Sequence, residues 1–180
     1  MKTKIRVTKT VTLGTKTLEE YKAAFEKQEK NRGTNWICFL DARYLVDQVQ
    51  VAESEVNIDL VFVTLDELGV SLNMGWGQQK EMYEKAVLLG LQRVPPEAAL
   101  ALALKIGTIR KYFNKMQKVC FCTEPLTCLV AGSTRKKRPH TFYFSPTVGG
   151  QIRFSREEYC DTRDQMVHYT DYYVFCVPRN

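Results

Sequence analysis

The sequence predicts one α+β domain over residues 1–180, built from a mostly antiparallel β-sheet with two or three packed helices. Its length of 180 residues and its hydrophobic content of 44% are typical of a single domain with one core. Short alternating or aromatic runs, characteristic of antiparallel strands, occur near both ends of the chain. Two longer stretches, at 18–30 and 78–89, carry apolar residues at helical spacing.

The first predicted elements are a half-exposed strand and a capped helix. Polar and apolar residues alternate over 5–13, which is the period of a strand with one buried face. Thr17 and Glu20 have the spacing of a capping box, in which each side chain binds a free amide at the helix start. A helix over 18–30 follows, and the Asn-Arg-Gly sequence at 31–33 favours the left-handed conformation that ends it.

The middle of the chain predicts a buried strand and a second helix. Residues 35–46 suit a short helix that is followed by a loop or an edge strand. The run IDLVFVT at 58–64 is almost continuously apolar, which is typical of a central strand covered on both faces, with Asp59 directed to solvent. Helical spacing over 78–89 ends at Gly90, because glycine tolerates the left-handed conformation after a helix.

Pro95 and Pro96 separate this helix from a stretch whose conformation the residues leave open. Proline suits a first helical position, so the sequence PPEAA predicts one helical turn. Residues 100–105 alternate Leu and Ala, which fits a strand with one apolar face or a helix, and intrinsic propensity favours the helix. The rest of the chain is β-rich, with a hairpin turn expected at the Gly-Gly pair 149–150. The strands expected there cover 118–123, 141–145, 151–154 and 172–177.

Several stretches resemble a group of uncharacterised bacterial proteins of about this length. The group's pattern is VDLVxVxxxELG, a helix ending in LGL, CPxEVGPxLRLQY and a terminal WVFV. The similar stretches here are IDLVFVTLDELG at 58–69, EKAVLLGL at 84–91, VPPEAALALAL at 94–104 and YYVFCV at 172–177. A Gly-Pro pair interrupts the group's third segment, so the resemblance favours a strand over 100–105 after one helical turn. Some members carry a helicase label, but this chain has no G-x-x-x-x-G-K-[ST] phosphate loop.

The cysteines predict neither disulfides nor a metal site. The chain has six cysteines, at positions 38, 120, 122, 128, 160 and 176. Because no export signal precedes them, we expect reduced thiols. A closed zinc site usually has two tightly spaced pairs of ligands. The Cys120-x-Cys122 motif has no such counterpart, even with Cys128, His140, Cys160 or His168 as further ligands. We interpret the cysteines as core residues and expect no metal and no cofactor.

No stretch of the sequence predicts contact with a membrane. Spanning a bilayer takes about 18 consecutive apolar residues, and no such run occurs. The N-terminal residues MKTKIRVTKT lack the apolar centre of a signal peptide. We therefore expect a cytoplasmic protein.

Two basic stretches predict contact with nucleic acid. Residues 105–138 contain nine Lys or Arg and one Asp or Glu. Cations neutralise phosphates, and aromatic rings such as Tyr112 and Phe113 stack on unpaired bases. A solvated surface is the alternative, and we expect Phe142 and Phe144 to face the core. The candidate contact residues are Lys111, Lys115, Lys118, Arg135, Lys136, Lys137 and Arg138.

Two histidines provide the candidate groups for acid–base catalysis. His140 follows the RKKRP run, where a solvated loop or a phosphate contact is expected. His168 lies beside Tyr169 and Asp171 in sequence, and pairing with a carboxylate would make half of a hydrolytic site. Neither histidine belongs to a G-x-S-x-G or HExxH motif. A small hydrolase or nuclease is therefore an alternative, and the sequence favours a protein without catalysis.

The charge distribution supports a binding role. Residues 44–104 carry nine Asp or Glu against three Lys or Arg, the reverse of the balance over 105–138. We interpret the chain as a noncatalytic binding module of bacterial or mobile-element origin that contacts nucleic acid through a basic patch. The alternative partner is a protein or a nucleoprotein complex, such as a host defence component, captured by electrostatic complementarity. The oligomeric state is left open, and the nucleic-acid hypothesis requires the cations to converge on one surface.

Overall fold

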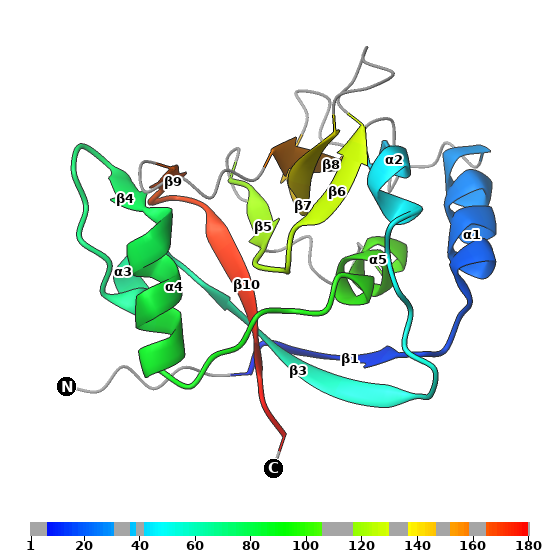
Figure 1. Cartoon of the computed structure of the whole chain (residues 1–180), viewed down its shortest axis with the longest axis horizontal. Coiled ribbons are helices and arrows are strands. Elements are labelled where there is room, and N and C mark those ends of the chain that lie inside the picture. The colour runs from blue at the N-terminus through cyan, green and yellow to red at the C-terminus, as the bar shows by residue number, and fades with distance from the viewer. Residues whose placement is uncertain are drawn as a thin grey trace.

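A strongly coiled, mostly antiparallel sheet organises the chain (Figure 1). The computed structural model describes residues 7–30, 37–38, 42–105, 117–129, 137–146, 152–158 and 165–179. The strand order is β1-β3-β10-β5-β7-β8-β2, with β6 against β7, and parallel pairing is confined to β10–β5 and β2–β8 among these strands. The strands are β1 (Lys9–Leu13), β2 (Ile37–Cys38), β3 (Val56–Val63), β5 (Val119–Phe121), β6 (Leu126–Leu129), β7 (Lys137–Pro146), β8 (Ile152–Glu158) and β10 (Tyr172–Val177).

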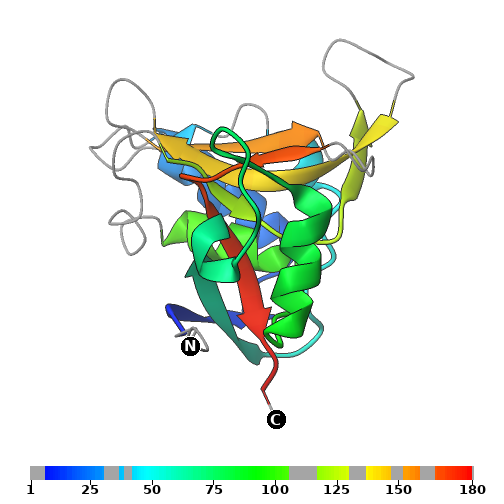
Figure 2. The same cartoon turned by 90° about the vertical axis from the view of Figure 1, so that its left-hand side faces the viewer.

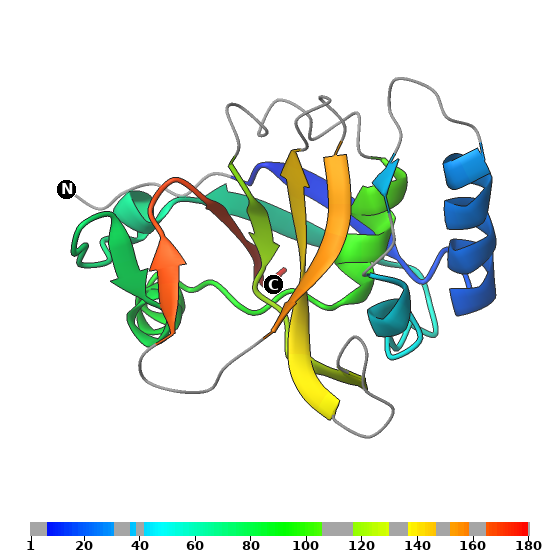
Figure 3. The ribbon, with the colours of Figure 1, turned by 90° about the horizontal axis from the view of Figure 1, so that it is seen from above.

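Five helices cover the two faces of this sheet within the described residues. They are α1 (Leu18–Lys30), α2 (Arg43–Val46), α3 (Leu65–Leu68), α4 (Gln79–Leu88) and α5 (Glu97–Leu104). In Figures 1 and 3, α1, α2 and α5 lie on one side, while α3 and α4 lie at the opposite end of the molecule. The predicted single α+β domain with a mostly antiparallel sheet is confirmed.

The strand β3 is central, as its apolar sequence predicts. It pairs with β1 on one side and with β10 on the other. Leu60 and Phe62 belong to the core cluster beneath α5, and Val61 and Val63 belong to a second cluster against α3 and α4. Successive side chains of a strand point to opposite faces, so a strand buried on both faces needs apolar residues at every position.

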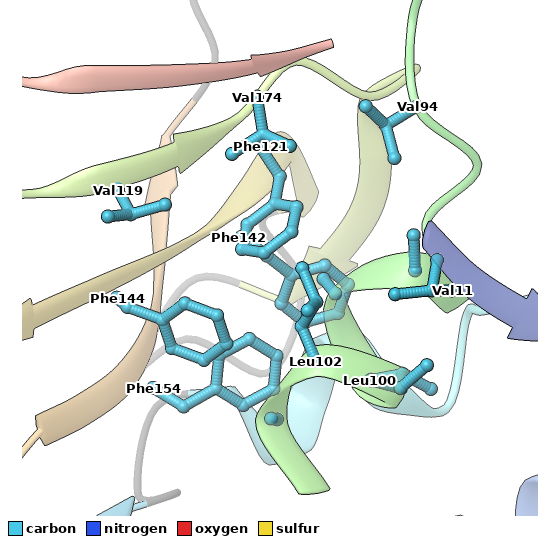
Figure 4. Packing of buried hydrophobic residues seen from close by; sticks show 14 of the residues in the cluster. Val11, Val94, Leu100, Leu102, Val119, Phe121, Phe142, Phe144, Phe154 and Val174 are labelled. Carbon is cyan, nitrogen blue, oxygen red and sulfur yellow. The ribbon is translucent and has the colours of Figure 1, made fainter. Parts of the chain in front are cut away.

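The larger core cluster is filled by aromatic rings from β7 and β8 (Figure 4). Phe154 lies 5.0 Å from Phe142 and 4.9 Å from Phe144, measured between ring centroids. Phe142 and Phe144 therefore face the core, as expected from their alternation with Tyr143.

Local capping signals set the starts of two helices. At α1, the amide of Thr17 donates to Glu20 Oε2 at 2.7 Å and the amide of Glu20 donates to Thr17 Oγ1 at 3.3 Å, which confirms the predicted capping box. Thr64 and Glu67 form the same motif at α3, a stretch that the sequence predicts only as a short turn. The helix α4 ends before Gly90, which has a φ of +77°.

The strand favoured over 100–105 by the resemblance is wrong. Residues Glu97–Leu104 form one continuous helix, α5, as propensity favours. Seven of its eight residues are buried, because α5 lies inside the curve of the sheet and contacts protein on all sides. A fully buried helix needs no polar face, so alternating Leu and Ala leave its sequence without helical periodicity.

Other differences concern short elements. The region 35–46 contains β2 before the short helix α2, with 35–36 and 39–41 outside the described residues. The sequence analysis misses β6 and two three-residue strands, β4 (Trp76–Gln78) and β9 (Met166–His168). The predicted turns at 31–33 and 149–150 lie outside the described residues, although β7 and β8 do pair antiparallel.

A buried carboxylate joins three segments at the start of α5. Glu97 is 1% exposed. Its Oε1 accepts hydrogen bonds from the amide of Gly14 at 2.9 Å and from the hydroxyl of Tyr21 at 3.1 Å, and its Oε2 accepts from the amide of Ala52 at 2.8 Å. The β1–α1 turn, α1 and the segment before β3 therefore meet at one side chain. Burial and the nearby Glu97 raise the pKa of the Tyr21 hydroxyl.

Asp59 is half-buried on β3 and is held by specific partners rather than simply directed to solvent. Its carboxylate accepts from Thr10 and from two guanidinium nitrogens of Arg179, at 2.6 to 2.9 Å. These hydrogen bonds lower the pKa of Asp59 to about 2. The pair ties the C-terminal segment to β3.

None of the helices in the described residues has the length and apolar character required to traverse a bilayer.

Candidate functional site

A pocket lies on the face of the sheet opposite α5, beneath a small β-ribbon. The strands β4 and β9 form this ribbon, with Trp76 opposite His168 and Gln78 opposite Met166. Figure 2 views the molecule from this side and shows the ribbon and α4 in front of the sheet. Gly77 of β4 packs closely against the side chains of Val70 and Leu65, which would have to shift to admit a Cβ atom there.

The pocket has a volume of about 430 Å³ and a mixed lining. This volume is within the range of pockets that hold small ligands or single side chains. Its walls come from the ribbon, from α4, from four strands of the large sheet (β5, β7, β8 and β10) and from residues beside those strands. The groups that matter for its chemistry are Trp76, Lys118, Glu157, His168, Asp171 and Tyr173.

Lys118 forms one wall and is already paired. Its Nζ lies 3.3 Å from Glu157 Oε1 and 4.8 Å from the centre of the Tyr143 ring. Burial opposes the charged form, but the attraction of Glu157 is the main influence that outweighs it, so the pKa of Lys118 is raised overall. Lys118 is therefore a cation whose charge is balanced inside the pocket.

Asp171 carries the buried negative charge of the pocket. The residue is 9% exposed, and its Oδ1 accepts a hydrogen bond from the amide of Lys118 at 3.0 Å. Within the described part of the chain, Oδ2 has no hydrogen bond and the carboxylate forms no ion pair. Burial raises the pKa of Asp171, because a desolvated carboxylate favours its neutral form.

His168 contacts an aromatic ring and a hydroxyl rather than the carboxylate. Its ring centroid lies 4.7 Å from that of Trp76 with the two planes nearly perpendicular, and its Nδ1 lies 2.7 Å from Thr170 Oγ1. The backbone carbonyl of His168 accepts from the Tyr173 hydroxyl at 2.9 Å. The predicted pairing of His168 with a carboxylate therefore does not involve Nδ1, and the ring serves as part of the pocket wall.

Two cysteines line the back of the pocket. Cys120 and Cys122 lie on one face of β5 and its extension, as their spacing predicts. Burial raises the pKa of both thiols. The thiolate is the nucleophilic form of cysteine, so neither side chain is activated for attack.

The ribbon presents exposed apolar side chains beside the pocket mouth. Asn73 and Trp76 exchange two backbone hydrogen bonds, of 2.8 and 3.0 Å, around the two-residue turn Met74-Gly75. Both turn residues have positive φ, +50° at Met74 and +84° at Gly75, which is the pattern of a type I′ hairpin turn. Met74 is 95% exposed at the tip.

Four further large apolar side chains are exposed on the ribbon or on the residues next to it. They are Leu72, Trp76, Met166 and Tyr169, each between 43% and 48% exposed. The amide of Tyr169 donates to the carbonyl of Gly75, and a side chain at Gly75 would collide with the Tyr169 ring, so turn and ring are held together. Together with Met74 these residues form what we call the ribbon patch.

Two of the predicted nucleic-acid contacts have described side chains, and they lie far apart. Lys118 precedes the Val119–Phe144 pair, whereas Arg138 lies opposite Cys128. Six residues of β7 separate Phe144 from Arg138, which corresponds to about 20 Å. Arg138 shares the strand face of Phe144, while Lys118 lies over Tyr143 on the other face.

The remaining predicted contacts cannot be compared in this way. Lys111, Lys115, Arg135 and Lys136 lie outside the described residues, as does the side chain of Lys137. The convergence of the basic stretches therefore stays a prediction.

The two histidines have different settings. His140 is 7% exposed on β7, and its Nδ1 lies 2.8 Å from the carbonyl of Arg138. It belongs to the strand rather than to a solvated loop and does not line the pocket. His168 does line it.

The sequence analysis misses most of the pocket. Trp76, Glu157 and Tyr173 are not singled out, because they come from segments distant in sequence that no motif links. The sequence places Asp171 next to His168, but it does not reveal that both line one pocket with Lys118, whose amide donates to Asp171. Exposed aromatic and sulfur-containing residues in the turn-rich sequence NMGWG, at 73–77, are the signal that could indicate a surface site.

Neither a metal site nor a similar protein points to a function. Among the described residues, no three His, Cys, Asp or Glu side chains are arranged to hold a metal ion. Comparison with protein-family models, curated proteins and solved structures finds no match to this chain.

Proposed function

We propose that the protein is a noncatalytic, cytoplasmic binding module that docks on a partner protein through the ribbon patch. The observation that carries this proposal is Met74, 95% exposed at the tip of a hairpin whose two strands and adjoining residues expose further aromatic and aliphatic side chains. Methionine and aromatic residues are enriched in protein interfaces relative to other surfaces. Single exposed apolar residues are ordinary, but a contiguous group around a fixed turn is typical of an interaction site.

The backbone of Met74 supports a functional reason for its presence. A left-handed conformation costs a residue other than glycine about 1–2 kcal/mol, and Asn, Asp or Gly are the usual choices for this turn. Met74 gains no burial in exchange, because its side chain is 95% exposed. Backbone strain of this kind persists most often at binding sites. A partner that buries Met74 would supply the missing stabilisation.

The charges near the patch favour a basic partner. The adjoining helices α3 and α4 carry four acidic residues and two lysines. The pocket beneath the ribbon adds Glu157 and Asp171 against Lys118. A positively charged protein surface would therefore be attracted to this end of the molecule, and the phosphates of a nucleic acid would be repelled.

The groups in the pocket support binding rather than catalysis. Its thiols are protonated, Lys118 is neutralised by Glu157, and the Nδ1 of His168 is engaged with a hydroxyl. Nucleophilic catalysis needs a nucleophile within hydrogen-bonding reach of a base that is oriented by a third group. The Thr170 hydroxyl is within reach of His168, but no described residue hydrogen-bonds the other ring nitrogen to orient the base.

We expect Met74→Gly to weaken partner capture by at least about tenfold without destabilising the protein, because a central exposed anchor typically accounts for more than 1.4 kcal/mol of binding. Glycine suits the left-handed turn, so the free energy of unfolding should stay constant or rise by up to about 1 kcal/mol. Capture is measured with immobilised protein in nuclease-treated bacterial lysate, and stability by chemical denaturation.

Leu88→Ala is the matched control for this variant. Leu88 is 81% exposed at the opposite end of α4 and belongs to no part of the ribbon patch. Capture should be as strong with Leu88→Ala as with the wild type. A partner that is retained by Met74→Gly but lost by Leu88→Ala would move the docking surface to the end of α4 and contradict the proposal.

Single-stranded nucleic acid is the second candidate partner. The observation that favours it is the composition of residues 105–138, which carry nine Lys or Arg against one Asp or Glu. In this candidate Lys111, Lys115 and Arg135 through Arg138 contact phosphates.

The affinity for nucleic acid should fall steeply as salt is added. A plot of the logarithm of the binding constant against the logarithm of the salt concentration should have a slope of about −0.7 for each phosphate neutralised. Replacing Arg135, Lys136, Lys137 and Arg138 with Ala should lower the affinity for a fluorescent single-stranded oligonucleotide and reduce the slope. The double variant Lys80→Ala and Lys85→Ala removes two positive charges from α4, and it should change neither the affinity nor the salt slope. An affinity that is independent of salt, or unaffected by the fourfold replacement, would argue against this candidate.

A further inference from the structure

We propose that the pocket beneath the ribbon binds a cationic side chain, arginine or lysine, with Asp171 as its counterion. This inference rests on the proposed function for the source of that side chain, a basic partner protein. The affinity of the pocket for a cation follows from its charges, its aromatic rings and its position.

The described residues that line the pocket leave one negative charge to be balanced. The lysine and carboxylate side chains among them are Lys118, Glu157 and Asp171. Lys118 pairs with Glu157 through Nζ and gives Asp171 a backbone N–H rather than its ammonium group. Lys118 and His168 attract the Asp171 carboxylate, but neither forms an ion pair with it within the described residues. A buried carboxylate without an ion pair is costly, and a bound cation would reduce that cost.

The second carboxylate oxygen of Asp171, Oδ2, indicates where the cation would bind. Oδ1 accepts from the amide of Lys118, and Oδ2 makes no hydrogen bond with any described residue. A charge-assisted hydrogen bond from a guanidinium or ammonium group would satisfy it. The desolvation that raises the pKa of Asp171 would be offset by the same contact.

The aromatic walls suit the rest of such a ligand. Trp76 and Tyr173 line the pocket, and Trp76 is the ring type that attracts cations most strongly. The protein already places two of its own cations over tyrosine rings nearby, Arg93 over Tyr83 at 4.5 Å and Lys118 over Tyr143 at 4.8 Å. A ligand cation over Trp76 would extend an arrangement that this fold already uses.

The position of the pocket links it to the ribbon patch. Trp76 and Met166 line the pocket and are also exposed on the patch, each at 44%. A partner that covers Met74 and Tyr169 could therefore direct one basic side chain past Trp76 to Asp171. Such an interface would combine an apolar contact with one buried, specific ion pair.

The test uses small probes and the intact chain. Nα-acetyl-arginine amide and Nα-acetyl-lysine amide are titrated separately while the backbone amide signal of Lys118 is followed by nuclear magnetic resonance. This amide donates to Asp171 and should shift in a saturable manner when a cation binds. Nα-acetyl-citrulline amide, which has the shape of the arginine probe without its charge, should bind at least about tenfold more weakly.

The variant Asp171→Asn removes the charge and keeps an oxygen that can accept from Lys118. We expect it to weaken binding of the cationic probes by at least about tenfold. Glu84→Gln, an exposed carboxylate on α4 outside the pocket, should leave their binding unchanged. If Asp171→Asn fails to fold, the citrulline comparison in the wild-type protein still decides the question.

Equal binding of the citrulline and arginine probes, or no saturable shift with either cation, would overturn the inference. Saturation by one cation and not the other supports it and identifies the side chain. Failure of the proposed function is seen separately, as partner capture that is insensitive to Met74→Gly, because the probes bind without any partner protein.

Discussion

Glu97→Ala is expected to lower the free energy of unfolding by about 4 kcal/mol. The substitution removes the acceptor of three hydrogen bonds, from the amides of Gly14 and Ala52 and from the hydroxyl of Tyr21. Each buried donor left without a partner costs about 1–3 kcal/mol, and relaxation of the two partly buried amides toward water should keep the total near the lower end of the sum. Urea denaturation followed by circular dichroism measures the change.

Because of its position, the Glu97 side chain holds several segments of the tertiary structure together. It is the first residue of α5, where a negative charge also interacts favourably with the helix dipole. Its three donors belong to the β1–α1 turn, to α1 and to the segment leading into β3. Without the carboxylate, these segments lose their common attachment to the helix that fills the core.

Two other substitutions separate this effect from a general effect of losing charge. Glu97→Gln keeps one side-chain oxygen as an acceptor and should cost less than Glu97→Ala. Glu53→Ala removes an exposed carboxylate from the neighbouring segment and should change stability by no more than about 0.5 kcal/mol. A Glu97→Ala protein as stable as Glu53→Ala would show that the three hydrogen bonds contribute nothing to stability.

The elements that could be predicted from sequence are those whose burial leaves a periodic pattern. Alternation identifies β1, a continuous apolar run identifies β3, and the Thr17–Glu20 box identifies the start of α1. The helix α5 cannot be recognised from a periodic pattern of apolar residues, because burial on all sides removes the polar face that would show a helical period. There the intrinsic propensity of Ala and Leu was the better guide than the resemblance to another group.

The pocket could not be predicted for a different reason. Its residues come from α4, from β4, β5, β7, β8, β9 and β10 and from the turn before β10, and the three-residue strands of the ribbon are too short to show any period. Sequence shows that Lys118 is basic but not that Glu157, 39 positions away, neutralises it. Charge counted along the chain therefore overstates how much of it is available to a ligand.

Gly14→Ala is the second substitution for which we expect a large effect, a loss of about 4 kcal/mol in the free energy of unfolding. Gly14 has a φ of +70°, and a Cβ atom there would lie 2.1 Å from the carbonyl oxygen of Ser54. The left-handed conformation costs alanine about 1–2 kcal/mol, and displacing a packed backbone segment adds about 1–3 kcal/mol. The obstacle is backbone, so no rotation of a side chain can relieve it.

Gly69→Ala and Gly90→Ala isolate the conformational part of this cost. Both glycines have a similar positive φ, +73° and +77°, and neither would place a Cβ within 4 Å of another group. Each should therefore lose about 1–2 kcal/mol, the cost of the backbone conformation alone. Because the amide of Gly14 also donates to Glu97, movement of the β1–α1 turn should weaken that contact, and Gly14→Ala combined with Glu97→Ala should cost less than the two separate losses together. Additive losses, or a Gly14→Ala protein no less stable than Gly69→Ala, would mean that the turn and the carboxylate do not form one junction.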